Sequence, residues 1–253
     1  MSQRFDLTGR VALIAGASRG IGAAIAHGFA EHGATVICSS RKQADCEKVA
    51  EAIRDAGGQA ISAELHLGKL SDHGKVVDMI EEKYGRLDIL VNNGATNPFM
   101  GASHDAPEGA YDKTFEVNVK GPYYLSSTAI PLMLKNGKGA IVNVASIDGI
   151  QPAKGRVIYG MTKAAVIAMT KGMAKEYGNQ GIRVNALLPG FTDTRLASAL
   201  KQAPGLQDFM DENLAISRMA QPDEMVGAVL YMASDAGSYF TGQGMVVDAG
   251  AII

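Results

Sequence analysis

Apolar residues follow two alternating patterns along the chain. Short continuous apolar runs predict buried strands, and longer stretches with apolar residues every three or four positions predict helices. The runs predict strands at residues 10–15, 34–39, 59–65, 87–91, 140–144, 182–188 and 245–248. The longer stretches predict one helix that ends near residue 29 and further helices at 42–56, 71–84, 108–135, 156–178 and 223–233.

The regular alternation of strand and helix predicts the fold class. Strand–helix–strand units give parallel neighbours, and right-handed crossovers place their helices on both faces of the sheet. We therefore expect an α/β protein with a Rossmann-type doubly wound sheet of seven parallel strands, built as a single domain over residues 1–253. Residues 189–221 interrupt the rhythm, and because long connections often carry function, this segment is a candidate substrate lid.

A glycine-rich turn separates the first predicted strand from its helix. The turn contains Gly16, Ser18, Arg19, Gly20, Ile21 and Gly22. Its glycines allow close approach of a pyrophosphate to the backbone, and the helix N-terminus offers free N–H groups and a positive dipole end. The turn predicts a nucleotide site at the carboxyl ends of the strands. A tight strand-to-helix turn without a ligand is the alternative.

Composition and charge exclude several classes of protein. Lys and Arg number 24 and Asp and Glu 26, so the formal net charge is -2, with no basic cluster for nucleic acid and no basic amphipathic stretch for a membrane surface. No apolar run reaches the ~18 residues of a membrane span, and the polar N-terminus lacks the core of a signal peptide. The two cysteines, Cys38 and Cys46, give no sign of a disulfide framework, so we expect a cytoplasmic protein.

The histidines outside the candidate site show no metal-ligand spacing. We expect them on the surface or in loops, and we predict no metal site. They are His27, His32, His73 and His104.

Tyr159 and Lys163 are the candidate acid/base pair. They stand four positions apart on the helix predicted for residues 156–178, so they share one helix face. A free tyrosine ionises near pH ~10, and an ammonium group beside it favours the phenolate, which brings the hydroxyl into a useful range for proton transfer. Ser146 follows the strand predicted for residues 140–144, and its hydroxyl could hold a carbonyl oxygen beside the tyrosine.

These residues belong to a set of motifs through which nearly the whole chain resembles the short-chain dehydrogenase/reductase superfamily. The motifs occur in the family's order, on the expected elements and at the family's distances. They are the Gly16/Gly20/Gly22 turn, Asn92-Asn93-Gly94-Ala95, Asn118, Ser146, Tyr159 with Lys163, and Pro189-Gly190 followed by Thr194. Three further segments are similar to the NADPH-dependent carbonyl and retinal reductase branch, namely residues 39–43, 65–68 and 97–101.

The resemblance implies a catalytic tetrad of Asn118, Ser146, Tyr159 and Lys163. Tyr159 would exchange a proton with the substrate oxygen, and Ser146 would orient the substrate. Lys163 would bind the nicotinamide ribose and, with the cationic nicotinamide ring, favour the tyrosinate. Asn118 would hold a proton-relay water, although an asparagine inside a helix is often only a solvated surface residue.

The resemblance also implies the residues that bind the cofactor. They are Gly16, Ser18, Arg19, Gly20, Ile21, Gly22, Ser39, Ser40, Arg41, His66, Leu67, Asn93, Gly94, Ala95, Tyr159, Lys163, Pro189, Gly190, Thr192 and Thr194. Three positions depart from the family pattern. Ala15 replaces a threonine, and Gly94-Ala95 reverses the usual Ala-Gly order. His66 replaces the aspartate that usually meets the adenine, so that contact stays open.

The end of the second predicted strand indicates the choice of cofactor. An acidic residue there binds the ribose 2′-hydroxyl of NAD, but here Ser40 and Arg41 stand in its place, and Asp45 is the next carboxylate. A guanidinium can hold a 2′-phosphate bidentately, and Arg19 can approach the same phosphate from the glycine turn. We therefore predict NADP(H), with NAD(H) less favoured. The alternative is that Arg41 and Lys42 are a solvated helix start.

The resemblance implies hydride transfer between NADP(H) and a carbonyl or alcohol substrate. Apolar side chains of the candidate lid favour an apolar ketone or aldehyde, unless they only pack the segment onto the body. The lid residues concerned are Phe191, Leu196, Leu200, Phe209, Met210 and Leu214. A dinucleotide-binding sensor or regulator without catalysis is the alternative from another class, and loss of a tetrad residue would favour it.

A homotetramer is the expected assembly. Family members are commonly tetramers that join partly through the long helices carrying Asn118 and Tyr159, and closed symmetry is the usual form of such oligomers. In this chain those helices carry more apolar surface than one sheet face needs. The residues concerned are Tyr123, Tyr124, Leu125, Ile167 and Met173.

Overall fold

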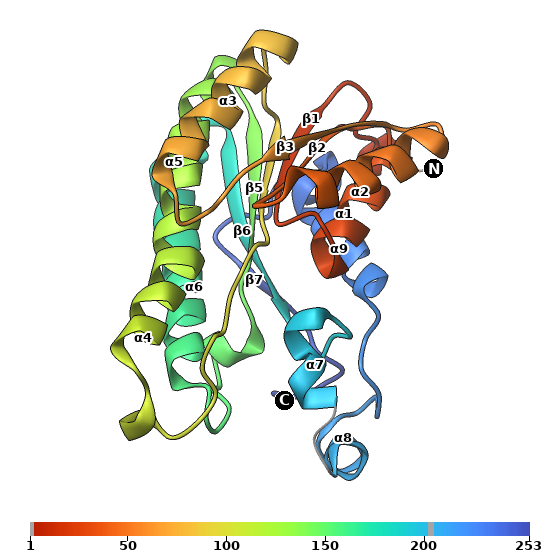
Figure 1. Ribbon diagram of the computed structural model, residues 1–253. Coiled ribbons are helices and arrows are strands. Elements are labelled where there is room, and N and C mark those ends of the chain that lie inside the picture. Colours follow the sequence, from red (N-terminus) through yellow and green to blue (C-terminus); the bar gives the residue numbers. More distant parts are fainter. Residues whose placement is uncertain (1–2, 202–204) are drawn as a thin grey trace.

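A parallel sheet forms the centre of the protein (Figure 1). The computed structural model describes residues 3–201 and 205–253, and across these ranges seven strands pair in the order β3-β2-β1-β4-β5-β6-β7. The strands are β1 (Val11–Ala15), β2 (Thr35–Ser40), β3 (Gln59–Glu64), β4 (Ile89–Asn92), β5 (Gly139–Val144), β6 (Ile182–Pro189) and β7 (Gly244–Val247). The predicted Rossmann-type doubly wound fold is confirmed.

The central strands are buried on both faces because helices cover the sheet from either side, and their sequences are accordingly almost all apolar. One face packs against α1 (Gly20–Glu31), α2 (Gln43–Asp55) and α9 (Val226–Ala233). The other packs against α3 (Leu70–Tyr84), α5 (Gly121–Lys135) and α6 (Val157–Tyr177). Phe29 on the first face and Leu125 on the second are fully buried.

The helix predicted for residues 108–135 is interrupted by a wider turn. It consists of α4 (Glu108–Phe115), a π-helical turn (Glu116–Lys120) and α5. Apolar periodicity does not distinguish an α-helical turn from a π-helical one, so the sequence predicted one uninterrupted helix. Turns of this kind occur often at functional sites, and this one carries Asn118.

One histidine prediction was wrong. His73 lies in α3 with its side chain buried, and its Nε2 is 2.9 Å from the carbonyl oxygen of Leu67. The ring therefore connects α3 to the loop that follows β3, a contact that the spacing of the histidines does not reveal.

The strand order reverses beside β1, and this reversal places the candidate site. The chain leaves β1 toward β2 and β3 on one side, then returns to β4 on the other side of β1. In open parallel sheets ligands bind in the crevice at such a switch point, outside the carboxyl ends of the strands. The candidate lid continues from β6 at this end, with α7 (Ser198–Lys201) and α8 (Leu206–Asn213) at the lower right of Figure 1. Residues 202–204 of this segment lie outside the described residues.

Candidate active site

The glycine-rich turn has no room for side chains at two of its glycines. A Cβ on Gly22 would lie 2.2 Å from the carbonyl oxygen of Gly16, and a Cβ on Gly16 would lie 2.6 Å from Gly94 Cα. Gly16 also has a φ of 90°, a conformation that side chains disfavour. The side-chain amide of Asn93 donates to the Gly16 carbonyl at 2.8 Å, so the turn is packed against the loop after β4.

Basic side chains surround a cavity of about 440 Å³ beside this turn. It is lined by Ser18, Arg19, His27, Asp45, Lys48, Val49, Ala52 and Arg195. Ser18 and Arg19 were predicted from the sequence. The sequence analysis missed His27, Lys48 and Arg195, which come from α1, α2 and the start of the candidate lid and meet only in the folded chain.

The residues at the end of β2 differ in what they present to solvent. Ser39 is fully buried, and its hydroxyl donates to the Ile14 carbonyl at 3.0 Å, so this side chain holds β2 against β1. The Ser40 hydroxyl donates to the Lys42 carbonyl at 3.1 Å. Arg41 is exposed and has no hydrogen bond or ion pair to the described residues, so its guanidinium is available to an anion.

The loop after β6 lies next to the glycine-rich turn, and the loop after β3 lies next to Gly94, which packs on that turn. His66 accepts the N–H of Gly68 at its Nδ1, 3.0 Å away, and the buried Leu67 lies against Gly94, where an added Cβ would be 2.7 Å from Leu67 Cδ1. Thr194, from the loop after β6, lies 3.3 Å from the position of a Cβ on Gly20. Thr194 therefore lies at the glycine-rich turn and Leu67 at Gly94 beside it, while the hydrogen bond of the His66 ring stays within its own loop.

Two further predicted residues fix the start of the candidate lid. Gly190 passes so close to Asp248 that a Cβ would lie 2.7 Å from the Asp248 Cα. Thr192 is buried and forms an isolated bridge with Ala220. The segment is thus packed against the residue after β7 where it leaves β6, and its two ends pair with each other through Thr192 and Ala220.

Tyr159, Lys163 and Ser146 meet at the carboxyl end of β5. Tyr159 and Lys163 are buried on α6, and the Lys163 Nζ lies 5.4 Å from the centroid of the Tyr159 ring. The ammonium group also donates to the Val144 carbonyl at 2.7 Å, which ties α6 to β5. Ser146 lies two positions after the end of β5, close enough to Tyr159 to lower the pKa of its phenol, and its hydroxyl donates to Asp148 Oδ2 at 3.4 Å. The structure therefore brings together three of the four predicted catalytic residues.

Burial is the largest influence on the pKa values of Tyr159 and Lys163. Burial raises the pKa of Tyr159 to about 12, against the opposing effects of Arg156 and Ser146. Burial also lowers the pKa of Lys163 to about 8. The sequence predicts that the Lys163 ammonium and a cationic nicotinamide ring together favour the phenolate, and this stays a prediction; spacing does not reveal the loss of solvent, which acts in the opposite sense. At neutral pH the Tyr159 side chain is a neutral phenol that can donate a proton.

Asn118 lies in the π-helical turn, and its side-chain amide makes hydrogen bonds to residues outside that turn. Its Oδ1 accepts the N–H of Thr96 at 2.8 Å, and its Nδ2 donates to the Thr96 carbonyl at 2.9 Å and to the Thr162 hydroxyl at 3.2 Å. The side chain is buried, so the alternative of a solvated surface asparagine is wrong. Asn118 joins the loop after β4 to α6, one turn from Tyr159.

The sequence analysis missed two charged residues that contact this group. Asp148 follows Ser146 by two positions, and Arg156 precedes Tyr159 by three. The two form an ion pair of 2.9 Å, and the Arg156 guanidinium lies 4.7 Å from the centroid of the Tyr159 ring. Their spacing from Ser146 and Tyr159 was the only available signal.

Within residues 3–201 and 205–253, no three His, Cys, Asp or Glu side chains are grouped so that they could hold a metal ion. In the same ranges, none of the helices combines the length and the apolar character needed to span a bilayer.

The chain matches known proteins along almost its entire length. A family model described as enoyl-(acyl carrier protein) reductase matches residues 16–251. The human protein named dehydrogenase/reductase SDR family member 4 is 36% identical over 250 residues, covering 99% of this chain and 90% of that protein.

Solved structures share the fold at similar identity. A gluconate 5-dehydrogenase from Burkholderia cenocepacia, in complex with NADP and tartrate, superimposes with a TM-score of 0.94 at 31% identity and covers 98% of this chain and 97% of its own. A 7α-hydroxysteroid dehydrogenase, complexed with NADH and 7-oxo glycochenodeoxycholic acid, gives a TM-score of 0.93 at 32% identity, with coverage of 99% and 97%. The fold described above is thus shared with dehydrogenases that bind nicotinamide dinucleotides.

The pKa of Lys163 predicts how stability depends on pH. Between pH 8, the folded value, and pH 10.5, the ordinary value, the unfolded chain holds a proton that the folded chain has lost. The free energy of unfolding therefore rises with pH in this window, while Tyr159 acts in the opposite sense only between pH 10 and 12. From pH 8 to pH 10, denaturant unfolding should show wild type gaining stability relative to Lys163→Met.

The matched control is Lys171→Met, which removes an exposed ammonium group from the same helix. Its difference from wild type should stay constant over this pH range. An equally constant difference for Lys163→Met would contradict the lowered pKa of Lys163.

Proposed function

Since the chain belongs to the short-chain dehydrogenase/reductase family, and its relatives are named as dehydrogenases or reductases, we propose that it transfers hydride between NADP(H) and a carbonyl or alcohol substrate, with Tyr159 as its acid/base. The observation that carries the proposal is the meeting of Tyr159, Ser146 and Lys163 at the carboxyl end of β5. The glycine-rich turn opens on the same edge of the sheet, so a dinucleotide held there would extend toward Tyr159.

The residues present fit a bound dinucleotide. At Gly16 and Gly22 any Cβ would collide with neighbouring atoms, which leaves bare backbone beside the N-terminus of α1 for a pyrophosphate. When bound, NADPH supplies the hydride that reduces the substrate. Pro189, Gly190, Thr192 and Thr194 would hold the nicotinamide end, and Lys163 its ribose.

The chain's own groups handle the proton. In the reducing direction, the neutral Tyr159 phenol donates its proton to the substrate oxygen as negative charge develops there. The Ser146 hydroxyl orients the same oxygen, and the Lys163 ammonium stabilises the phenolate that is left. Asn118 fixes the loop after β4 against α6 through its bonds to Thr96 and Thr162, which keeps the wall of the site in place.

Tyr159→Phe tests the proton donor. The variant should fold and bind NADPH like wild type, but kcat should fall by at least ~10²-fold, the lower range for loss of a general acid. NADPH oxidation with a carbonyl substrate, followed by absorbance, gives the rate, and cofactor fluorescence gives the affinity. Tyr239→Phe, at a fully exposed tyrosine, is the matched control and should leave kcat unchanged. Near-normal turnover by Tyr159→Phe would refute the assignment.

A regulator without catalysis is the competing function. Asn118, Ser146, Tyr159 and Lys163 are all present, and the similar proteins described above are named as dehydrogenases or reductases. Nothing in the site or in these relatives favours the regulator.

The preference for NADP(H) is supported by the charge around the adenosine end. No carboxylate stands at the end of β2, where Arg41 is exposed, and the cavity beside the turn contains Arg19, Lys48 and Arg195. A 2′-phosphate would meet the guanidinium groups of Arg19 and Arg195 there, and Asp45 is the one carboxylate in the cavity lining. The gluconate 5-dehydrogenase with bound NADP supports this choice, while the hydroxysteroid dehydrogenase with bound NADH shows that the same fold accepts the other cofactor.

Arg41→Ala tests the choice of cofactor. We expect NADPH binding to weaken by roughly 2 kcal/mol, the lower end for a truncated charge pair because Arg41 is exposed, with little change for NADH. Isothermal titration with both cofactors measures the difference. Lys42→Ala removes the adjacent exposed charge and is the control. It should change the preference for NADPH over NADH less than Arg41→Ala does. Equal kcat/KM for NADPH and NADH in the wild-type enzyme would overturn the preference.

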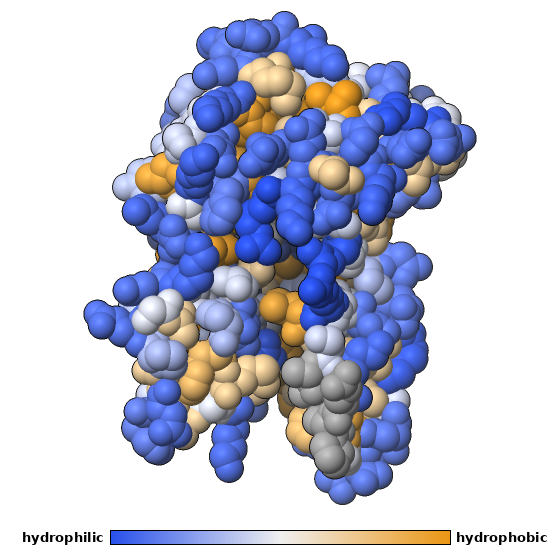
Figure 2. Space-filling view, viewed as in Figure 1, coloured by the Kyte–Doolittle hydropathy of each residue, from blue (hydrophilic) through white to orange (hydrophobic). Residues whose placement is uncertain are grey.

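We propose that residues 189–221 act as an apolar lid and that the substrate is an apolar ketone or aldehyde. Figure 2 shows a hollow on this face, beside the part that carries α7 and α8. Leu196 and Phe209 are exposed, and Phe191 packs edge-to-face on Phe209 with ring centroids 5.7 Å apart. Met210 and Leu214 are buried, which fits the alternative that apolar side chains only pack this segment onto the body. The side chain of Leu200 lies outside the described residues.

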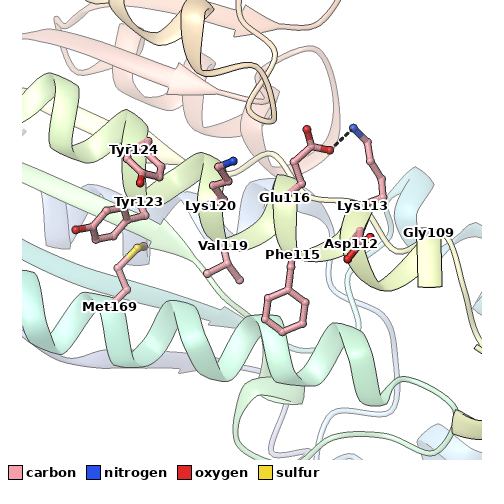
Figure 3. A pocket seen from close by; sticks show the side chains of 10 residues that line it. All are labelled: Gly109, Asp112, Lys113, Phe115, Glu116, Val119, Lys120, Tyr123, Tyr124 and Met169. Atoms are coloured by element: carbon pink, nitrogen blue, oxygen red, sulfur yellow. Dashed lines mark hydrogen bonds and ion pairs between the residues drawn. The ribbon is translucent and has the colours of Figure 1, made fainter. Parts of the chain in front are cut away.

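The proposed tetramer is supported by a groove on α4, α5 and α6 (Figure 3). The groove has a volume of about 840 Å³, and the exposed Tyr123 and Tyr124 rings lie at one end, near Met169 of α6. Exposed aromatic side chains along long helices are typical of protein interfaces. The groove is lined by Gly109, Asp112, Lys113, Phe115, Glu116, Val119, Lys120, Tyr123, Tyr124 and Met169.

Light scattering tests the assembly. At micromolar concentration we expect a homotetramer, and Tyr124→Lys should shift the mass toward smaller species because it places a charge in the apolar contact. Tyr239→Lys adds the same charge at an exposed tyrosine outside the groove and should leave the mass unchanged. A wild-type monomer would contradict the proposal.

A further inference from the structure

An ion pair that the proposed reaction does not use lies directly beside Tyr159. Asp148 stands in the short helical turn after Ser146 and is buried. Its Oδ2 accepts the Arg156 Nη1 at 2.9 Å and lies 3.4 Å from the Ser146 hydroxyl. Its Oδ1 accepts the N–H of Ala153 at 3.1 Å. One carboxylate thus connects Ser146, the loop before α6 and Arg156.

Arg156 is held over the ring of Tyr159. Its guanidinium carbon lies 4.7 Å from the ring centroid, closer than the Lys163 Nζ at 5.4 Å. Cations at such distances interact favourably with the face of an aromatic ring, more strongly when solvent is excluded, and Tyr159 is buried. Two cations therefore contact the ring, one from the N-cap of α6 and one from its second turn.

The position of Arg156 is locally unfavourable in two respects. It is the N-cap of α6 and makes no side-chain cap, although a serine or aspartate would bond the free N–H groups and a positive charge opposes the helix dipole. Its Nε is also buried without a hydrogen-bond partner among the described residues. Groups that break local rules in this way are expected at functional sites.

We propose that Arg156, held by Asp148, is a positioning residue that fixes the Tyr159 ring and supplies a second positive charge to the proposed acid/base. The proposal rests on the proposed function, because it assigns Arg156 a role through Tyr159. Asp148 has two effects in this arrangement. It keeps the guanidinium in place, and its own negative charge partly offsets that of Arg156.

The charges around the pair determine the expected pH effects. Among the described residues, the charged groups that act on Tyr159 and Lys163 are Asp148 from the turn after β5 and Arg156 from the N-cap of α6. Arg156 lowers the pKa of both groups, and Asp148 raises the pKa of both. Loss of either charge therefore shifts the titration of the site, and the two losses act in opposite directions.

A purely structural role makes a different prediction. If the ion pair only fastens the loop of residues 149–155 to α6, its loss would loosen the site whichever partner is removed. Arg156→Met and Asp148→Asn would then both lower kcat without opposite pH shifts. The sign of each shift, rather than the loss of activity, therefore separates the two roles.

The experiment compares Arg156→Met, Arg156→Lys and Asp148→Asn in the full-length enzyme. With Arg156→Met we expect kcat for carbonyl reduction at neutral pH to fall about 10-fold, a weaker effect than loss of the acid itself. The alkaline limb of its pH–rate profile should move to higher pH. With Asp148→Asn that limb should move to lower pH. Arg156→Lys should restore most of kcat and the wild-type limb, because it keeps the charge.

A second readout does not depend on turnover. The pKa of Lys163 can be followed by NMR of its ε-carbon, assigned with Lys163→Met, and should rise in Arg156→Met and fall in Asp148→Asn. Lys154→Met removes an exposed charge from the same loop and should move neither the NMR titration nor the pH profile. Thermal unfolding confirms that each variant is folded.

The outcomes keep this inference distinct from the proposed function. Opposite shifts in the Lys163 titration would support the proposed roles of Arg156 and Asp148 even if wild type reduced no carbonyl. Absence of carbonyl reduction would refute only the proposed function. Turnover by wild type with no shift, or with shifts of the same sign, would overturn the role of Arg156. A rise in KM confined to acidic substrates, with the pH limb unmoved, would also overturn it and make Arg156 a contact for a substrate anion.

Discussion

The reversal of strand order between β1 and β4 is the constraint on which the site depends. Because β1 pairs with β2 on one side and β4 on the other, the loops after these strands diverge and leave a crevice at their carboxyl ends. The glycine-rich turn after β1 lies against the loop after β4, where Gly16 and Gly94 approach too closely for any side chain. The next strand, β5, then brings Ser146 and the α6 residues to the same edge.

Burial at this edge sets the chemical state of the proposed acid/base pair. An ammonium group and a phenol in solvent would both be polar surface groups, but here both lie inside the protein. Loss of solvent disfavours the charged form of each, which keeps Tyr159 protonated and makes Lys163 easier to deprotonate. The Val144 carbonyl and Asp148 offset part of this cost for the Lys163 ammonium, and Arg156 offsets part of it for the Tyr159 phenolate. The burial that sets the protonation state of this pair thus also has a free-energy cost, because the Lys163 ammonium is less stable inside the protein than in solvent.

The sequence predicted features that are local in the chain and missed those that depend on distant contacts. The strands were predictable because central parallel strands are almost wholly apolar, and Tyr159 and Lys163 because four positions make one helix face. The π-helical turn was missed because apolar periodicity does not distinguish it from an α-helical turn, and the contacts of Asn118 were missed because Thr96 lies 22 positions away. The pairing of Asp148 with Arg156 was missed for a similar reason, since a turn and a loop separate them in the chain.

The central claim is that this crevice transfers hydride to a carbonyl carbon. The most direct measurement is a single-turnover reaction of the wild-type enzyme with NADPH deuterated at the transferable position, against a panel of apolar ketones and aldehydes. Mass spectrometry then locates the label. We expect deuterium to move to the carbinol carbon of an alcohol product in amounts stoichiometric with the enzyme. Tight binding of NADPH with no label in any product across the panel would contradict it.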